Sequence, residues 1–178
     1  MRYCLEASHL VQHAFSSAPK YTEIKAGLPE DYASIKTIGD LLQINYKLVE
    51  AKEQLRQNLI HMMKSSGTKY PGLIGYDDDV IPALDRAILS CHDVFLIGQI
   101  GQAKTRLVEV IAKHLLSPIP VIDGSITNDT PMDLPQDDLA SLLEGQDPTS
   151  PSPKFHISPE SAKKIQDNKL DTKIIWVD

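Results

Sequence analysis

Residues 93–116 read D-V-F-L-I-G-Q-I-G-Q-A-K-T-R-L-V-E-V-I-A-K-H-L-L, and this stretch decides the predicted fold. Residues 93–97 are a short apolar run rich in strand-forming side chains, which predicts a strand buried on both faces, as in a parallel sheet. The glycine-rich residues 98–103 predict a turn. From residue 104 onward apolar side chains recur every three or four positions, so we expect a helix over 104–116.

The turn and the start of this helix spell a phosphate-binding motif. Residues 98–105 read G-Q-I-G-Q-A-K-T, which fits the pattern G-x-x-x-x-G-K-[ST] except at the sixth position. Glycines allow a backbone to close around phosphates, and a helix N-terminus supplies N–H donors. A lysine reaches the outer phosphates, and a threonine hydroxyl binds Mg²⁺. The predicted phosphate-binding residues are Gly98, Gln99, Ile100, Gly101, Gln102, Ala103, Lys104, Thr105 and Arg106.

Within this motif we assign Lys104 the catalytic role and Thr105 the Mg²⁺ ligand. Gly98 and Gly101 are expected to permit positive φ angles. Ala103 is the one departure from the pattern, and it costs little if it adopts helical angles at the helix start. Arg106 could contact a phosphate or pair with an acidic side chain at the surface.

Outward from the motif, the remaining patterns predict a mixed α/β chain. The first thirty residues are weakly patterned and suggest loops or a frayed extension. Ser158 is expected to cap a helix, with Pro159 at its first position. The other predicted elements are helices at 44–64, 80–88 and 137–144, a strand at 120–123, a flexible linker at 145–153, a helix at 158–168 and a strand at 174–177.

The composition of the chain argues against some classes of binding partner and some cellular locations. The formal net charge is -6 and no basic stripe occurs, so nucleic acid and anionic membranes are not expected partners. Cys4 and Cys91 lie far apart, which favours reduced thiols over a disulfide or zinc site. No apolar run approaches the ~20 residues that span a bilayer, and residues 1–15 are too polar for a signal peptide. We therefore expect a cytoplasmic protein.

Two longer stretches resemble the MoxR and magnesium-chelatase branch of the AAA+ ATPases. They are L-I-G-Q-I-G-Q-A-K-T-R-L at 96–107 and P-G-L-I-G-Y-D-D-D-V-I-P-A-L-D-R-A-I-L-S at 71–90. Ala-Lys-Thr in place of Gly-Lys-Thr is common in the MoxR group. The resemblance implies that Ile74 and Gly75 line an adenine pocket, that the cofactors are ATP and Mg²⁺, and that the full-length protein forms a hexameric ring. It also implies remodelling of a partner, such as a protein with a von Willebrand A domain.

On this interpretation the chain is a P-loop NTPase with an incomplete AAA+ core and a parallel sheet, preceded by a helical N-terminal segment. Residues 1–43 would be a partly disordered extension, and 44–178 the front part of the nucleotide-binding domain. The strand 174–177 and Asp178 could form a Walker B motif, although the following glutamate, the sensors and the lid are missing. Two alternatives stay open: a module that binds a nucleotide or a partner without hydrolysis, and a non-functional fragment.

Overall fold

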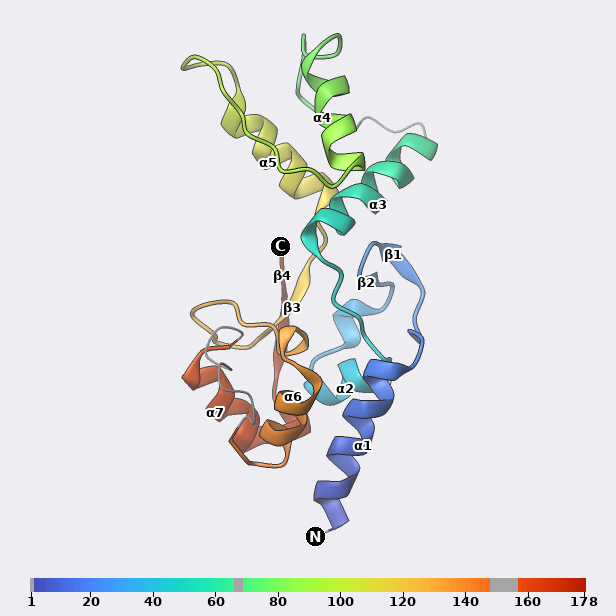
Figure 1. The fold of residues 1–178 in the computed structure, drawn as a ribbon, viewed down its shortest axis with the longest axis vertical. Coiled ribbons are helices and arrows are strands. Elements are labelled where there is room, and N and C mark those ends of the chain that lie inside the picture. Colours follow the sequence, from blue (N-terminus) through green and yellow to red (C-terminus); the bar gives the residue numbers. More distant parts are fainter. Residues whose placement is uncertain (1, 66–68, 148–156) are drawn as a thin grey trace. The chain divides into compact units, whose positions relative to one another are not determined.

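The computed structural model describes residues 2–65, 69–147 and 157–178 (Figure 1). Over these ranges the chain is an α/β protein with seven α-helices and two small antiparallel sheets. The helices are α1 Arg2–Ser16, α2 Ile38–Gln43, α3 Ala51–Lys64, α4 Val80–Leu89, α5 Lys104–Leu115, α6 Gln136–Leu143 and α7 Pro159–Asn168. The strands are β1 Glu23–Lys25, β2 Leu28–Pro29, β3 Ile119–Ile122 and β4 Ile174–Val177. Short 3-10 turns lie at Tyr32–Ser34, Pro131–Asp133 and Lys169–Asp171.

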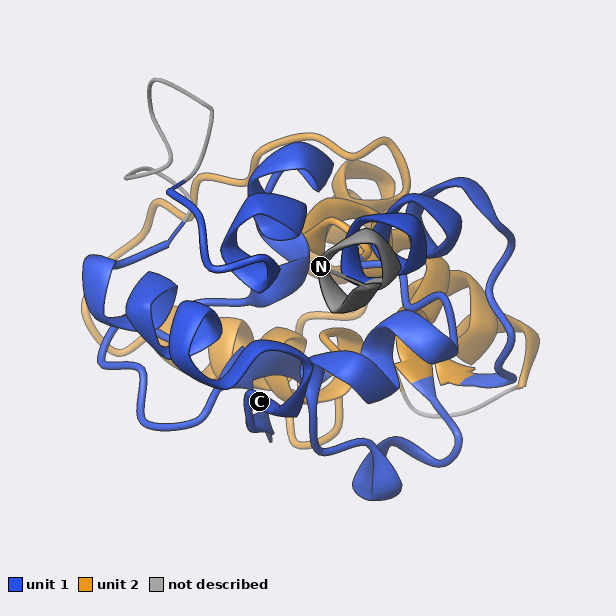
Figure 2. Cartoon of the chain, turned by 90° about the horizontal axis from the view of Figure 1, so that it is seen from below, with its two compact units in different colours: residues 1–23, 29–48, 118–177 blue, residues 24–28, 49–117, 178 orange. Residues whose placement is uncertain are grey.

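The described chain divides into two compact units, coloured separately in Figure 2. Unit 1 comprises residues 1–23, 29–48 and 118–177, and unit 2 comprises residues 24–28, 49–117 and 178. Each unit groups residues that lie close in space, so it combines separate stretches of the chain. The predicted boundary between residues 43 and 44 treats each part as one continuous stretch. The predicted linker at 145–153 lies largely outside the described residues. No helix in the described ranges is long and apolar enough to cross a membrane.

Unit 1 begins with a helix whose bounds the residue pattern did not predict. Residues 2–16 form α1, where we expected loops or a frayed extension. Ala7, Val11 and Ala14 are buried at spacings of four and three, so they form one face of the helix. This face packs on α6 and α2. The stripe consists of small side chains, and for that reason its helical period is easy to overlook.

The sheet of unit 1 is antiparallel, not parallel as predicted. β3 pairs with β4 in a register that places Ile119 opposite Val177 and Ile122 opposite Ile174. Both strands were predicted close to their observed bounds, and only their direction was wrong. Trp176 on β4 packs edge-on against Tyr46, with ring centroids 5.6 Å apart, and its indole N–H donates to the carbonyl of Ile35 over 3.2 Å.

A buried carboxylate joins two loops of unit 1. Asp129 Oδ2 accepts from Ser125 Oγ at 2.9 Å, Ser158 Oγ at 2.6 Å and Ser158 N at 3.2 Å. Ser158 also caps α7, as predicted, by accepting from Ser161 N. Burial alone would raise the pKa of Asp129, but hydrogen bonds from surrounding hydroxyl groups outweigh it and lower the pKa to about 2.

Replacing Asp129 with Asn should destabilise unit 1 at pH 7. The folded pKa of about 2 lies below the ordinary value of 3.8, so the ionised form contributes about 2 kcal/mol. This stability is complete above pH 3.8 and is lost as pH falls through 2. Urea unfolding followed by Trp176 emission should therefore show a deficit for Asp129→Asn at pH 7 that shrinks toward pH 2. Asp167→Asn, at an exposed position on α7, is the control, and an equal effect of both changes would contradict the assignment.

Unit 2 is a three-helix assembly in which α3 contacts both α4 and α5. Helices α4 and α5 match their predicted bounds closely, whereas α3 begins at Ala51 rather than at residue 44. Apolar side chains from all three helices form its core. The buried members are Leu59, Tyr70, Ile81, Leu84, Ile88, Leu107, Val110 and Leu115.

The predicted strand at 93–97 is absent. This segment is irregular, and Phe95 and Ile97 are 87% and 84% exposed. No backbone hydrogen bond involves Val94 to Ile97 within the described ranges. A strand is stable only beside another strand, and the pair β3–β4 belongs to unit 1. Strand-forming side chains alone therefore did not produce a strand here.

Candidate functional site

The predicted phosphate loop connects the irregular segment to α5 in unit 2. Gly101 has a φ of 88°, so glycine is required there. The first residue of α5 is Lys104, and Thr105 and Arg106 complete its first turn. The N–H groups of a first helical turn have no partner within the helix. They face away from the helix body and are free to donate to an anion.

Ala103 does not adopt the helical angles that the sequence analysis assumed. It immediately precedes α5 with φ 49° and ψ 21°, in the left-handed region. A side chain with a Cβ atom is disfavoured there by about 1–2 kcal/mol relative to the right-handed region. Alanine therefore occupies a backbone conformation here that glycine would adopt more easily.

Ala103→Gly is expected to stabilise unit 2 by about 1 kcal/mol, because glycine enters the left-handed region without a Cβ clash. The same substitution at Ala112, exposed in the interior of α5, should instead destabilise it by about 1 kcal/mol. Urea unfolding followed by circular dichroism measures both. Destabilisation by both substitutions would show that residue 103 is not left-handed in solution.

The side chains of the loop close on its own backbone. Lys104 Nζ donates to Gly98 O over 2.8 Å and to Gln99 O over 2.6 Å. Gln102 Oε1 accepts from Gln99 N at 2.9 Å. The φ of Gly98 is not positive, contrary to expectation. A Cβ atom at residue 98 would overlap Gln102 Oε1, so any larger side chain there would displace the Gln102 amide.

An open hollow of about 590 Å³ lies beside the loop. It is lined by Ile100, Gly101, Gln102, Ala103, Lys104, Thr105, Arg106 and Glu109. Arg106 Nη1 lies 3.5 Å from Glu109 Oε2 in an exposed pair, which is the surface alternative considered above. All eight lining residues belong to the loop and the first turns of α5.

The predicted adenine-pocket residues sit apart from this hollow. Ile74 is 89% exposed, and Gly75 adopts a φ of 82°. Their neighbours Leu73 and Tyr76 line an apolar pocket of about 250 Å³ that also includes Lys104. The other lining residues are Val80, Leu96, Ile97, Gln102, Ala103 and Leu107. The loop therefore borders both an open hollow and an apolar pocket.

Two buried polar side chains of α3 hold the far end of α5, and the sequence analysis did not single them out. Asn58 Nδ2 donates to Leu115 O over 2.8 Å, and its Oδ1 accepts from Ala26 N at 2.9 Å. Gln54 Oε1 accepts from Ser117 N at 3.0 Å. In the sequence they look like polar positions on an amphipathic helix. A signal that could have found them is their spacing, because Gln54 and Asn58 lie four residues apart beside Leu59 on the buried face of α3.

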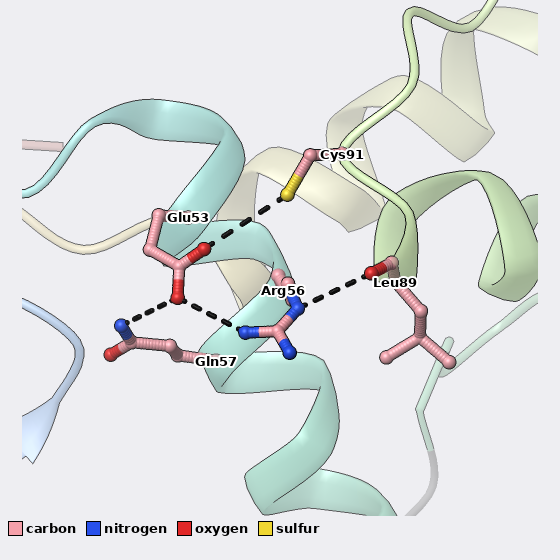
Figure 3. Close-up of polar contacts among 5 residues, drawn as sticks. All are labelled: Glu53, Arg56, Gln57, Leu89 and Cys91. Carbon is pink, nitrogen blue, oxygen red and sulfur yellow. Dashed lines mark hydrogen bonds and ion pairs between the residues drawn. The ribbon is translucent and has the colours of Figure 1, made fainter.

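A second set of α3 side chains holds the end of α4 (Figure 3). Arg56 Nε donates to Leu89 O over 3.2 Å, and Arg56 also pairs with Glu53. The hydrogen bond from Gln57 and the charge of Arg56 lower the pKa of Glu53. The Cys91 thiol lies 3.9 Å from Glu53 Oε2. Cys91 is a free, half-buried thiol that follows the end of α4.

The described residues offer few groups of side chains that could bind a metal ion. Among the described residues no cluster of three His, Cys, Asp or Glu side chains could hold a metal ion. Thr105 is exposed and lines the hollow. Mg²⁺ bound with a nucleotide takes most of its ligands from phosphate oxygens and water, so one hydroxyl group suits this donor set.

Comparisons with known proteins give one distant relative. The chain is 23% identical over 134 residues to an acetylglutamate kinase of Chlorobaculum parvum. The match covers 75% of this chain and 44% of that enzyme, so the chain spans less than half of its relative's length. No family model matches the chain. No solved structure matches it.

This relative corrects the resemblance to MoxR-type AAA+ ATPases. Acetylglutamate kinase is an amino-acid kinase with a different fold. The assigned function, an AAA+ ATPase fragment that remodels a partner, is therefore wrong, and the non-hydrolysing module fits no better. The motif at 98–105 is too short to identify a family by itself. The hexameric ring and the von Willebrand A partner remain untested.

Proposed function

We propose that residues 98–106 bind the phosphate groups of Mg-ATP and that the chain is part of an ATP-dependent phosphotransferase. The observation that carries this proposal is the placement of Lys104. Its ammonium group lies on the first turn of α5, 2.8 and 2.6 Å from two loop carbonyls, beside an open hollow. A cation next to free helical N–H groups is the arrangement that favours a phosphate.

Different residues of the loop would contact different parts of Mg-ATP. The amides of Thr105 and Arg106 and the ammonium group of Lys104 would hold the outer phosphates. The Thr105 hydroxyl would hold Mg²⁺, which neutralises charge on the phosphates when bound. The apolar pocket lined by Leu73 and Tyr76 has the size and chemistry for the nucleobase. Lys104 borders both the hollow and the pocket, so it joins the two parts of one ligand.

The relative supports transfer of the phosphate rather than its use in remodelling. Its name indicates a kinase that acts on acetylglutamate. We extend this to the present chain as phosphoryl transfer to a small acceptor, with acetylglutamate the first acceptor to test. Orientation by Lys104 and charge neutralisation are the main contributions that a protein makes to such a transfer. A cytoplasmic location, where ATP is abundant, accords with this proposal.

Equilibrium binding of ATP to the full chain, with and without Mg²⁺, tests the proposal. We expect saturable binding that strengthens with Mg²⁺, and in Thr105→Ala this strengthening should be largely lost. Binding of ADP but not of adenosine would show that the phosphate groups are required for binding. If ATP shows no saturable binding in either condition, the proposed function is wrong.

A further inference from the structure

In the free protein, two of the groups that a phosphate would need are already engaged. The Gln99 amide donates to Gln102 Oε1 over 2.9 Å. Lys104 Nζ donates to the carbonyls of Gly98 and Gln99. Each of these contacts is exposed to solvent, lies within the loop and must be exchanged when an anion enters.

The Gln102 side chain lies against Gly98, four residues before it in the sequence. Gly98 has no Cβ atom, and one built there would overlap Gln102 Oε1. The side chain of Gln102 therefore lies directly over the α-carbon of Gly98. Its amide oxygen takes the place next to the Gln99 N–H that a phosphate oxygen would otherwise take. Both oxygens are acceptors, so they compete for the same donor.

We propose that Gln102 is a positioning residue that closes the phosphate loop and competes with the incoming anion for the Gln99 amide. This inference rests on the proposed function and adds regulation of the same site. Binding then includes the displacement of a side chain as well as the gain of phosphate contacts. A solvent-exposed hydrogen bond between neutral groups contributes little, so Gln102 lowers the affinity for phosphate by roughly threefold to tenfold.

Three variants of the full chain separate competition from a merely structural role. Gln102→Ala removes the competing oxygen and should bind Mg-pyrophosphate roughly threefold to tenfold more tightly than wild type. Gln102→Glu keeps a similar shape but accepts more strongly and repels phosphate, so it should bind more weakly. Gln57→Ala is the matched control, because Gln57 is an exposed glutamine on α3 of the same unit and lies outside the loop. Pyrophosphate has no base, so the measurement reports on the loop alone.

A second measurement needs no ligand. The Gln99 amide proton should shift upfield in the ¹H–¹⁵N spectrum of Gln102→Ala, because its acceptor is gone. Opposite changes in affinity for the Ala and Glu variants, together with this shift, support the inference. If wild type and both Gln102 variants bind pyrophosphate with the same affinity, the inference is wrong but the proposed function stands. Failure of every variant and of wild type to bind pyrophosphate or ATP contradicts both.

Discussion

Lys104→Ala should lower the affinity for Mg-ATP by about 100-fold. The substitution removes a cation that can form two charge-assisted hydrogen bonds with phosphate oxygens, each worth about 1.5–3 kcal/mol. A total loss of about 3 kcal/mol corresponds to roughly two orders of magnitude in affinity. Isothermal titration calorimetry with Mg-ATP measures the loss directly.

The control for this prediction is Lys113→Ala. Lys113 is exposed in the last turn of the same helix, so its removal changes the net charge equally. It should leave the affinity nearly unchanged, because exposed charges that far from the loop are screened by salt. Retention of wild-type affinity by Lys104→Ala would exclude the loop as the phosphate site. A similar loss in both variants would show that only the net charge matters.

Asn58→Leu should destabilise unit 2 by about 3 kcal/mol. The leucine has a similar volume but leaves the amide of Ala26 and the carbonyl of Leu115 buried without their observed partners. Each such group costs about 1–3 kcal/mol. Because Leu115 is the last residue of α5, this change also loosens the helix that begins with Lys104.

Urea unfolding followed by far-ultraviolet circular dichroism measures this effect, since Trp176 lies in unit 1 and does not report on unit 2. Gln57→Leu is the control on the adjacent, exposed position of α3. It loses only a surface hydrogen bond to Glu53 and should change stability by less than about 0.5 kcal/mol. If Asn58→Leu proved as stable as wild type, Asn58 would not be holding the end of α5.

The elements that could be predicted from the sequence are those with a strong local signal. Helix α4 has a full amphipathic period, and α7 has Ser158 as its cap and Pro159 at its first position, so both were found within a residue or two. The motif likewise placed Lys104 at the start of α5. These features depend on neighbours within a few residues along the chain.

The features that were wrong or missed depend on partners that are distant in sequence. Residues 93–97 have the composition of a strand, but no strand lies beside them in unit 2. The direction of β4 depends on β3, which is more than fifty residues away. The role of Asn58 appears only when Ala26 and Leu115 are known to lie against it. The predicted family was wrong for a related reason, because it was inferred from two short stretches, 71–90 and 96–107, and not from the whole chain.

The backbone of Ala103 was predicted wrongly, because helical angles were expected and the residue is left-handed. The motif expects glycine where the structure has alanine in the left-handed region. The backbone shape is therefore imposed by the loop and α5, and not by the residue at that position. Strain kept at a site in this way is a common mark of a functional loop.

The irregular segment at 93–97 also makes unit 2 vulnerable to proteases. Phe95 is 87% exposed on a backbone with no hydrogen bonds among the described residues, so it can enter the active site of chymotrypsin without unfolding its surroundings. Cleavage after Phe95 would separate α4 from α5 and would leave the phosphate loop on the C-terminal piece. The rate of this single cut, read from a gel, offers a simple assay of ligands that order the loop.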